Sequence, residues 1–390
     1  KNISENVASL VYTSGTTGVP KGVMLTNANF ISNVDAARKE FSITAKDKFL
    51  SFLPLSHVLE RTLGSYIPIL SGAEIYYSEG IKQLKDNLAE VKPTILICVP
   101  KILERFYEGV RDNAEKGSNL KKKIFYFALK NKDNFFADVL VFRKIRKLFG
   151  GNLRFCVSGG ASINSRILKF FYNAKIKITE GYGLTETSPI ISANKLNNLR
   201  PGSVGELLED VQVKISVDKE ILVKGANVMK GYWQQAKKTK ETFDKDGWFK
   251  TGDQGYLDNE NFLFITGRKK DLIVTSNGKN IAPEKIENIL NLSPYILQSL
   301  VVGHKRSNLT VLIVVDKNNI KDINDVKSII QKEIDMVNKN LEHHEYIKAF
   351  ELIDHPFSQE LGELTPTLKI RRFIVEDKYA KVIERMYVKN

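Results

Sequence analysis

The chain has 390 residues, of which 42% are hydrophobic and 27% are charged, and 59 Lys and Arg against 45 Asp and Glu give a formal charge of +14. This is the composition of a globular protein with room for two or three domains. The positive charge suits nucleic acid, an anionic membrane surface or small polyanions such as ATP and coenzyme A, and a solvated Lys-rich surface explains it equally well. Because no zinc-finger, basic-zipper or RNA-binding aromatic motif occurs, we expect no nucleic-acid partner. No apolar run approaches the ~20 residues that span a bilayer.

The first predicted element is a strand over residues 7–13, VASLVYT, which we expect to be buried. It leads directly into the glycine-rich stretch TSGTTGVPKG, and no helix or cap stands before it. We therefore expect the chain to begin inside a domain, as an N-terminally truncated piece of a longer protein.

From residue 48 to about residue 160, short apolar runs alternate with helical patterns, which is typical of a layered α/β domain. Cys98 and Cys156 each lie inside an apolar run, so we expect buried thiols in a reducing compartment. Residues 121–149 are basic and aromatic and predict helices. Short β-like runs and turns then predict a small β subdomain over about residues 200–268, and residues 269–390 predict a separate, compact α+β domain.

The glycine-rich stretch does not follow the Walker A rule, which requires glycine before its lysine and Ser or Thr after it, so that a hydroxyl reaches Mg²⁺. Here Pro20 precedes Lys21 and Gly22 follows it. The stretch still offers backbone N–H groups and hydroxyls suited to phosphoryl oxygens. By itself it leaves phosphate binding and an ordinary glycine-rich turn both open.

In its longer form, YTSGTTGVPKGVMLTN, the stretch resembles the signature of the adenylate-forming enzymes, the superfamily that includes the AMP-forming acyl-CoA synthetases. The resemblance implies an α/β fold: a layered adenylation domain, here partial and covering residues 1–268, followed by a small mobile α+β domain over residues 269–390. It also implies that the loop holds the β- and γ-phosphates of ATP through Thr13, Ser14, Gly15, Thr16, Thr17, Gly18 and Lys21.

Two further stretches resemble the parts of that family that bind adenine and magnesium. EGYGLTETSP implies that Tyr182 lies against the adenine, that Thr185 contacts the α-phosphate, and that Glu186, with Thr13, is a ligand of Mg²⁺. The same stretch assigns Glu180, Gly181 and Gly183 to the nucleotide site, where glycine lets the backbone approach and one carboxylate meets a hard cation. VSGGASI implies that the adenine also lies beside Gly159, Gly160 and Ala161.

The later motifs follow in the family's order. GWFKTGDQG implies that Asp253 accepts hydrogen bonds from both ribose hydroxyls, a bidentate task for a carboxylate. GRKKDLIV implies that Arg268 contacts the nucleotide and that Asp271 is the hinge. GELTPTLKIRR implies that Lys369 bridges the substrate carboxylate and the α-phosphate after domain closure.

The stretch LPLSHVLER resembles the long-chain fatty acid branch and would place His57 near the carboxylate end of the acyl pocket, although a structural histidine is an equal interpretation. The resemblance implies ATP-dependent formation of acyl-AMP from a long-chain fatty acid with Mg²⁺, then transfer to coenzyme A, in the cytoplasm. A fatty acyl-AMP ligase that serves a carrier protein and a non-catalytic nucleotide- or lipid-binding fragment are the alternatives.

The basic segment at 120–149 interleaves Lys and Arg with Phe, Leu and Val, as an interfacial helix does. Peripheral association with the inner face of a membrane is one interpretation. Helices packed against the body of the domain, with basic outer faces, are the other.

Overall fold

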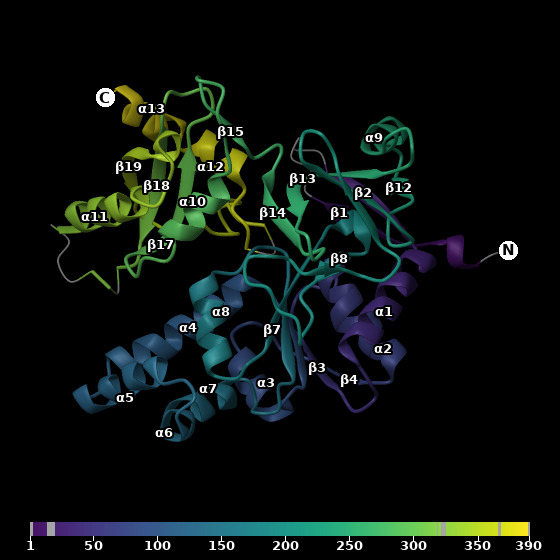
Figure 1. The fold of residues 1–390 in the computed structure, drawn as a ribbon, viewed down its shortest axis with the longest axis horizontal. Coiled ribbons are helices and arrows are strands. Elements are labelled where there is room, and N and C mark those ends of the chain that lie inside the picture. Colours follow the sequence, from purple (N-terminus) through teal and green to yellow (C-terminus); the bar gives the residue numbers. More distant parts are fainter. Residues whose placement is uncertain (1–2, 14–19, 318, 321–324, 366–367, 389–390) are drawn as a thin grey trace. The chain divides into compact units, whose positions relative to one another are not determined.

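The computed structural model describes residues 3–13, 20–317, 319–320, 325–365 and 368–388. The chain divides into two compact units, unit 1 with residues 1–251 and 255–265 and unit 2 with residues 252–254 and 266–390 (Figure 1). The domain border that the sequence suggests, after residue 268, stays a prediction.

A seven-stranded sheet of order β4-β3-β5-β6-β7-β8-β9 forms the centre of unit 1. Its first five strands are parallel, and β8 and β9 continue it in antiparallel pairing. Every residue of β5 and β6 is buried, as expected for parallel strands covered on both faces. The strands are β3 (Lys48–Ser51), β4 (Glu74–Tyr77), β5 (Ile95–Cys98), β6 (Phe155–Ser158), β7 (Ile178–Gly183), β8 (Ile190–Ala193) and β9 (Glu206–Leu207).

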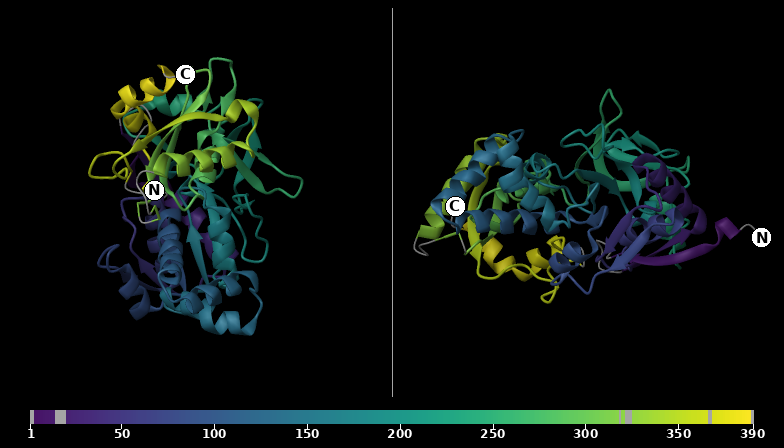
Figure 2. Two further views of the ribbon diagram at one scale, coloured as in Figure 1. Left: turned by 90° about the vertical axis from the view of Figure 1, so that its left-hand side faces the viewer. Right: turned by 90° about the horizontal axis from the view of Figure 1, so that it is seen from below.

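Helices cover this sheet, with α1 to one side of the strands and α4 and α8 to the other (Figures 1 and 2). The core that they share with the sheet includes Val34 of α1, Leu96 of β5 and Phe171 of α8. The helices of unit 1 are η1 (Ile3–Glu5), α1 (Asn27–Phe41), η2 (Glu60–Tyr66), α2 (Ile67–Ser71), α3 (Leu84–Val91), α4 (Pro100–Glu115), α5 (Asn119–Lys130), α6 (Phe135–Ala137), η3 (Asp138–Phe142), α7 (Arg143–Leu148), α8 (Ser165–Asn173), η4 (Thr185–Thr187) and α9 (Ala236–Thr242).

Two smaller sheets complete this part of the chain. One joins β1 (Val7–Thr13), β2 (Lys21–Thr26) and β12 (Gly231–Tyr232), and the other joins β10 (Gln212–Ile215), β11 (Glu220–Lys224), β13 (Phe249–Leu257) and β14 (Leu263–Arg268). The predicted strand at residues 7–13 is confirmed, but its expected burial is wrong, because Leu10 and Tyr12 are 40% and 64% exposed. Alternate residues of a strand point to opposite faces, and only Ser9 and Val11 point inward here.

Unit 2 is built on a three-stranded sheet of β17 (Ile296–Val302), β18 (Leu309–Val315) and β19 (Ile347–Ile353), in which β18 pairs antiparallel with β17 and parallel with β19. Val311 and Ile313 pack against α10 (Pro283–Leu290) and α11 (Val326–Asn338), whereas Leu312 and Val314 pack against α12 (Arg372–Lys378) and α13 (Ala380–Val388). The period of two along the strand therefore separates two cores. The remaining elements of unit 2 are β15 (Ile273–Val274), β16 (Asn280–Ile281) and η6 (His343–Glu345).

These layers confirm the expected α/β class with a small C-terminal α+β domain. Cys98 and Cys156 are free and fully buried, as expected, with their Sγ atoms 3.2 Å apart. Among the residues that the structure describes, no helix has the length and apolar character that crossing a membrane requires.

Candidate functional site

The ends of β6 and β7 bring two of the predicted nucleotide motifs together in unit 1. Ser158 pairs with Glu180 across these strands, and the Ile163 N–H donates to Oε1 of Glu180 at 3.2 Å. The loop that contains Gly159, Gly160 and Ala161 is therefore fastened to the first residue of EGYGLTETSP. Burial raises the pKa of Glu180 to about 7, although the Ile163 N–H acts against this rise.

Glycine is required at different positions of these motifs for different physical reasons. A Cβ at Gly183 would lie 1.7 Å from the carbonyl oxygen of Pro189, so any side chain there would collide with the backbone. A Cβ at Gly159 would come within 3.0 Å of Leu59 Cδ1. Gly160 has open space around it but a φ of +86°, which L residues rarely adopt. Packing and backbone conformation thus explain these glycines within the protein itself.

Glu186 lies in η4, in a corner held by buried polar contacts. Its carbonyl accepts the Met229 N–H at 2.8 Å, and its Oε1 accepts the Tyr232 hydroxyl at 2.8 Å. Asn227 donates to the carbonyls of Thr187 and Ile190 next to it. These bonds fix both the backbone and the carboxylate of Glu186.

Tyr232 also meets the lysine of the glycine-rich stretch. Lys21 begins β2 and pairs with Thr13 at the end of β1, and its Nζ lies 4.8 Å from the centre of the Tyr232 ring, in cation–π contact. Burial and the Glu186 carboxylate raise the pKa of Tyr232, so the phenol keeps its proton and remains a donor. One buried ring thus brings together Lys21 and Glu186, which are far apart in the sequence.

The remaining predicted residues of unit 1 are placed as follows. Gly181 and Tyr182 pair with Ala193 and Ser192 of β8, and Thr185 is the first residue of η4. The loop residues Ser14, Gly15, Thr16, Thr17 and Gly18 lie outside the described residues.

His57 has a structural contact of the kind that the structural interpretation of this histidine expects. Its Nδ1 accepts the Leu59 N–H at 3.2 Å at the start of a helical turn, in the manner of a helix cap. Because Leu59 packs close to Gly159, the segment that contains His57 lies beside the loop of Gly159, Gly160 and Ala161.

In unit 2, Asp253 and Arg268 form an ion pair. Asp253 is 6% exposed, and Arg268 Nε donates to its Oδ1 at 2.8 Å. The Arg268 carbonyl accepts the N–H groups of Asp271 and Leu272, which makes a tight turn directly after β14. The predicted ribose, nucleotide and hinge residues therefore occupy one short region.

Lys369 is exposed on a hairpin whose base is well anchored. Leu364 and Ile370 form a β-bridge, and the Lys369 N–H donates to Thr365 Oγ1 at 3.0 Å. At the base, the fully buried Glu363 pairs with Lys378 of α12 at 2.7 Å. Sequence reasoning missed Tyr232, which lies outside the quoted stretches, and gave no role to Glu363, which lies inside GELTPTLKIRR. Each of these residues acts through a partner outside its own stretch, Glu186 for Tyr232 and Lys378 for Glu363.

Two family models match the chain: AMP-binding enzyme over residues 1–233, and AMP-binding enzyme C-terminal domain over residues 270–390. The chain belongs to the AMP-binding enzyme family. Its similar relatives include the long-chain-fatty-acid–CoA ligase FadD15 of Mycobacterium tuberculosis, at 37% identity over 99% of this chain and 70% of that protein. Long chain acyl-CoA synthetase 7, peroxisomal, of Arabidopsis thaliana is 34% identical over 98% of this chain and 61% of that protein. The chain thus spans between three fifths and seven tenths of the length of these two relatives.

Solved structures show the same AMP-binding fold. The adenylation domain of a carboxylate reductase from Mycobacterium chelonae has a TM-score of 0.81 at 23% identity, covering 100% of this chain and 61% of that one. ATP-bound MatB from Rhodopseudomonas palustris has a TM-score of 0.75 at 24% identity, covering 97% and 69%.

The carboxylate available in this AMP-binding enzyme suits a Mg²⁺ ion that arrives bound to a nucleotide. The described residues contain no group of three or more His, Cys, Asp or Glu that could hold a metal ion. Mg²⁺ is commonly bound by one or two carboxylates together with substrate phosphates. Glu186, half-buried and oriented by Tyr232, suits that role.

Proposed function

We propose that the chain activates a long-chain fatty acid as acyl-AMP and then transfers the acyl group to coenzyme A. The observation that carries this proposal is the arrangement of Lys21 and Glu186 around Tyr232, at the strand pair that flanks the glycine-rich loop. Membership of the AMP-binding family and the names of the relatives support the substrate class.

In unit 1, we assign the phosphates of ATP to Lys21 and the loop Thr13–Gly18. Glu186 and Thr13 would hold Mg²⁺, which neutralises phosphate charge, and Thr185 would contact the α-phosphate. The adenine would lie between Tyr182 and the loop that contains Gly159, Gly160 and Ala161. This last assignment is supported by the bond that joins that loop to Glu180, which we place with Gly181 and Gly183 in the nucleotide site.

In unit 2, we assign the ribose to Asp253, which Arg268 orients through their ion pair. Asp271 would be the hinge, since its N–H closes the turn that follows β14. Lys369 would supply a cation during adenylation, and the anchored hairpin would present it at low cost in conformational entropy.

Both proposed steps are substitutions. In the first, a carboxylate oxygen of the fatty acid attacks the α-phosphorus, the bond to the β-phosphate bridging oxygen breaks, and pyrophosphate leaves. In the second, the coenzyme A thiolate attacks the acyl carbon and AMP leaves with the electron pair of the broken C–O bond, while the thiol proton passes to solvent. Cations that neutralise both anionic reactants accelerate the first step most.

A long-chain fatty acid substrate suits a cytoplasmic protein that associates with the inner face of a membrane. We assign His57 to the carboxylate end of the acyl pocket as a positioning residue, because its segment lies beside the loop that contains Gly159.

The test measures pyrophosphate release and acyl-CoA formation separately, with palmitate and then shorter acids. Replacement Lys369→Ala should lower pyrophosphate release by about 100-fold or more, since a group that stabilises transition-state charge is lost. Thioester formation from preformed acyl-AMP should change little. Lys381→Ala, a change of an exposed lysine on α13, is the matched control and should resemble the wild type.

Each alternative has its own outcome in this experiment. Acyl-AMP that forms while coenzyme A is never consumed would indicate an enzyme that serves a carrier protein. ATP binding without turnover would indicate a non-catalytic fragment. An equal loss in both steps with Lys369→Ala would contradict the role assigned to this lysine.

A further inference from the structure

The segment α5, α6 and η3 is packed onto unit 1 through one face only. Phe125 and Ala128 of α5, Ala137 of α6 and Phe142 of η3 are all at most 5% exposed and belong to the main core of unit 1. The segment is therefore a folded part of the domain. Figure 1 shows α5 and α6 at one end of unit 1, beyond α4 and α7.

The opposite face of this segment is apolar as well. Phe135 and Phe136 are 74% and 65% exposed, with ring centres 5.9 Å apart. In the same segment, two large side chains of α5 and two of η3 are also exposed, and we call the whole set the outer face: Leu120, Phe127, Phe135, Phe136, Val139 and Leu140. Single exposed apolar residues are ordinary, but a gathered set marks an interaction site.

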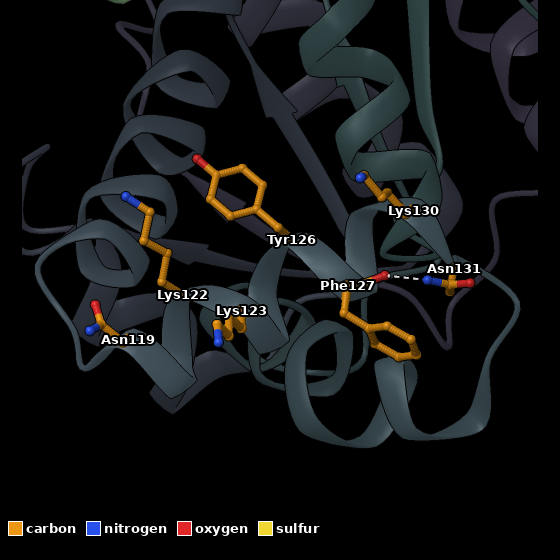
Figure 3. A pocket seen from close by; sticks show the side chains of 7 residues that line it. All are labelled: Asn119, Lys122, Lys123, Tyr126, Phe127, Lys130 and Asn131. Carbon is orange, nitrogen blue, oxygen red and sulfur yellow. Dashed lines mark hydrogen bonds between the residues drawn. The ribbon is translucent and has the colours of Figure 1, made fainter.

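Positive charge surrounds the outer face. Residues 119–147 contain nine Lys and Arg but two acidic residues, and one of these, Asp138, is already paired with Arg146 and Lys175. Within the part of the chain that the structure describes, Lys123, Lys130 and Lys132 form no ion pair. Figure 3 shows Lys122, Lys123 and Lys130 around an open hollow that Tyr126 and Phe127 also line. The expectation of packed helices with basic outer faces thus describes this segment incompletely.

We propose that the outer face binds the surface of an anionic lipid bilayer. The apolar side chains would enter the boundary between headgroups and acyl chains, while the lysines meet the anionic headgroups. A second copy of the chain would bring the same positive charge against itself, so charge complementarity favours the bilayer. The inference rests on the proposed function in one respect, because a membrane is a source of fatty acids.

The experiment measures co-sedimentation of the full chain with phosphatidylcholine vesicles, with and without phosphatidylserine. The wild type should bind the mixed vesicles much more tightly and should lose that preference at high salt. Phe135→Ser with Phe136→Ser should weaken binding by about tenfold or more, and Lys123→Glu with Lys130→Glu should remove the preference for phosphatidylserine. Phe373→Ser is the matched control, since Phe373 is 77% exposed in unit 2.

Acyl-AMP formation from a water-soluble short acid, measured on the same variants, separates this inference from the proposed function. Intact activity with weakened vesicle binding is the expected result. Wild-type binding that is absent, or equal on both vesicles, would overturn the inference. So would a wild-type dimer that the Phe135 and Phe136 changes dissociate, because a second copy would then cover the outer face.

Discussion

Two buried carboxylates, Glu60 in unit 1 and Glu287 in unit 2, are held in opposite ways. Glu287 Oε1 accepts from Arg372 Nη2 at 2.6 Å and from the Val301 N–H at 2.7 Å, and Arg372 also donates to the Val301 carbonyl. Glu60 is 1% exposed in the π-helical turn η2, and neither of its oxygens has a hydrogen-bond partner of good geometry among the described residues. Ser51 on β3 offers a weak contact.

The two regions meet the free-energy cost of burying a carboxylate in different ways. Burial raises the pKa of both carboxyls, and at Glu287 the Arg372 guanidinium and the Val301 N–H oppose that rise. The resulting network joins α10, β17 and α12. At Glu60, burial raises the pKa to about 7, so the carboxyl keeps its proton in the pH range between 4.5 and 7, where an exposed glutamate is ionised. Glu287 therefore ties three elements together through a guanidinium and a backbone N–H that oppose the rise in its pKa, whereas Glu60 has neither kind of partner among the described residues.

The largest expected effect comes from breaking the pair in unit 2. Arg372→Ala should lower the free energy of unfolding by about 3–5 kcal/mol, because it leaves the Glu287 charge buried without a partner. The double change Glu287→Leu with Arg372→Met should cost much less, since it removes both charges and keeps apolar volume. Urea unfolding of both variants measures this, and equal losses in the two would show that packing, not charge, explains the effect.

The next effect concerns pH and Glu60. The folded protein keeps a proton on Glu60 that the unfolded chain releases above its ordinary pKa of 4.5, so the free energy of unfolding falls as pH rises from 4.5 to about 7. The total loss is about 3 kcal/mol above pH 7. Glu60→Gln resembles the protonated form and should escape this loss.

Unfolding in urea at pH 5 and pH 8 tests this prediction. The advantage of Glu60→Gln over the wild type should be larger at pH 8, and any contribution from Glu180 cancels because both proteins contain it. Glu90→Gln, a change of an exposed residue on α3, is the matched control and should show no such trend. A constant difference between Glu60→Gln and the wild type at the two pH values would argue against a neutral Glu60.

Glu186 is intermediate between the two cases, since it is half-buried and has a neutral donor, Tyr232, as its partner. Tyr232→Phe removes the hydroxyl and keeps the ring against Lys21, so we expect a loss of about 1.5 kcal/mol, roughly tenfold in kcat/KM for ATP. More Mg²⁺ should be needed for half-maximal rate. An unchanged Mg²⁺ requirement would mean that Tyr232 does not position a metal ligand.

Local patterns predicted much of the fold. Apolar runs such as TILICVP and LTVLIVV contain β5 and β18 in full, because a buried strand needs consecutive apolar residues. The burial of β1 was not predictable in the same way. Its apolar residues alternate between a covered and an exposed face, and which face is covered depends on β2 and the elements behind it.

The residues of the candidate site also fall into a group that the sequence predicts and a group that it does not. The motif residues, from the glycine-rich stretch to Lys369, are recognisable in sequence because each motif is a short run of fixed spacing. The partners that support them are not recognisable in this way. Tyr232 contacts Lys21 and Glu186, and Glu363 pairs with Lys378, and both pairings join segments that are distant in the chain.

The fold class, the order of the motifs and the kinds of side chain available for chemistry were thus predictable from the amino-acid sequence, since these depend on neighbours along the chain. Three properties became visible in the folded protein alone: which charges are paired, which carboxyls have a raised pKa, and which apolar residues of α5 and α6 remain exposed. Those properties depend on burial, and burial is set by residues that are distant in sequence and adjacent in space.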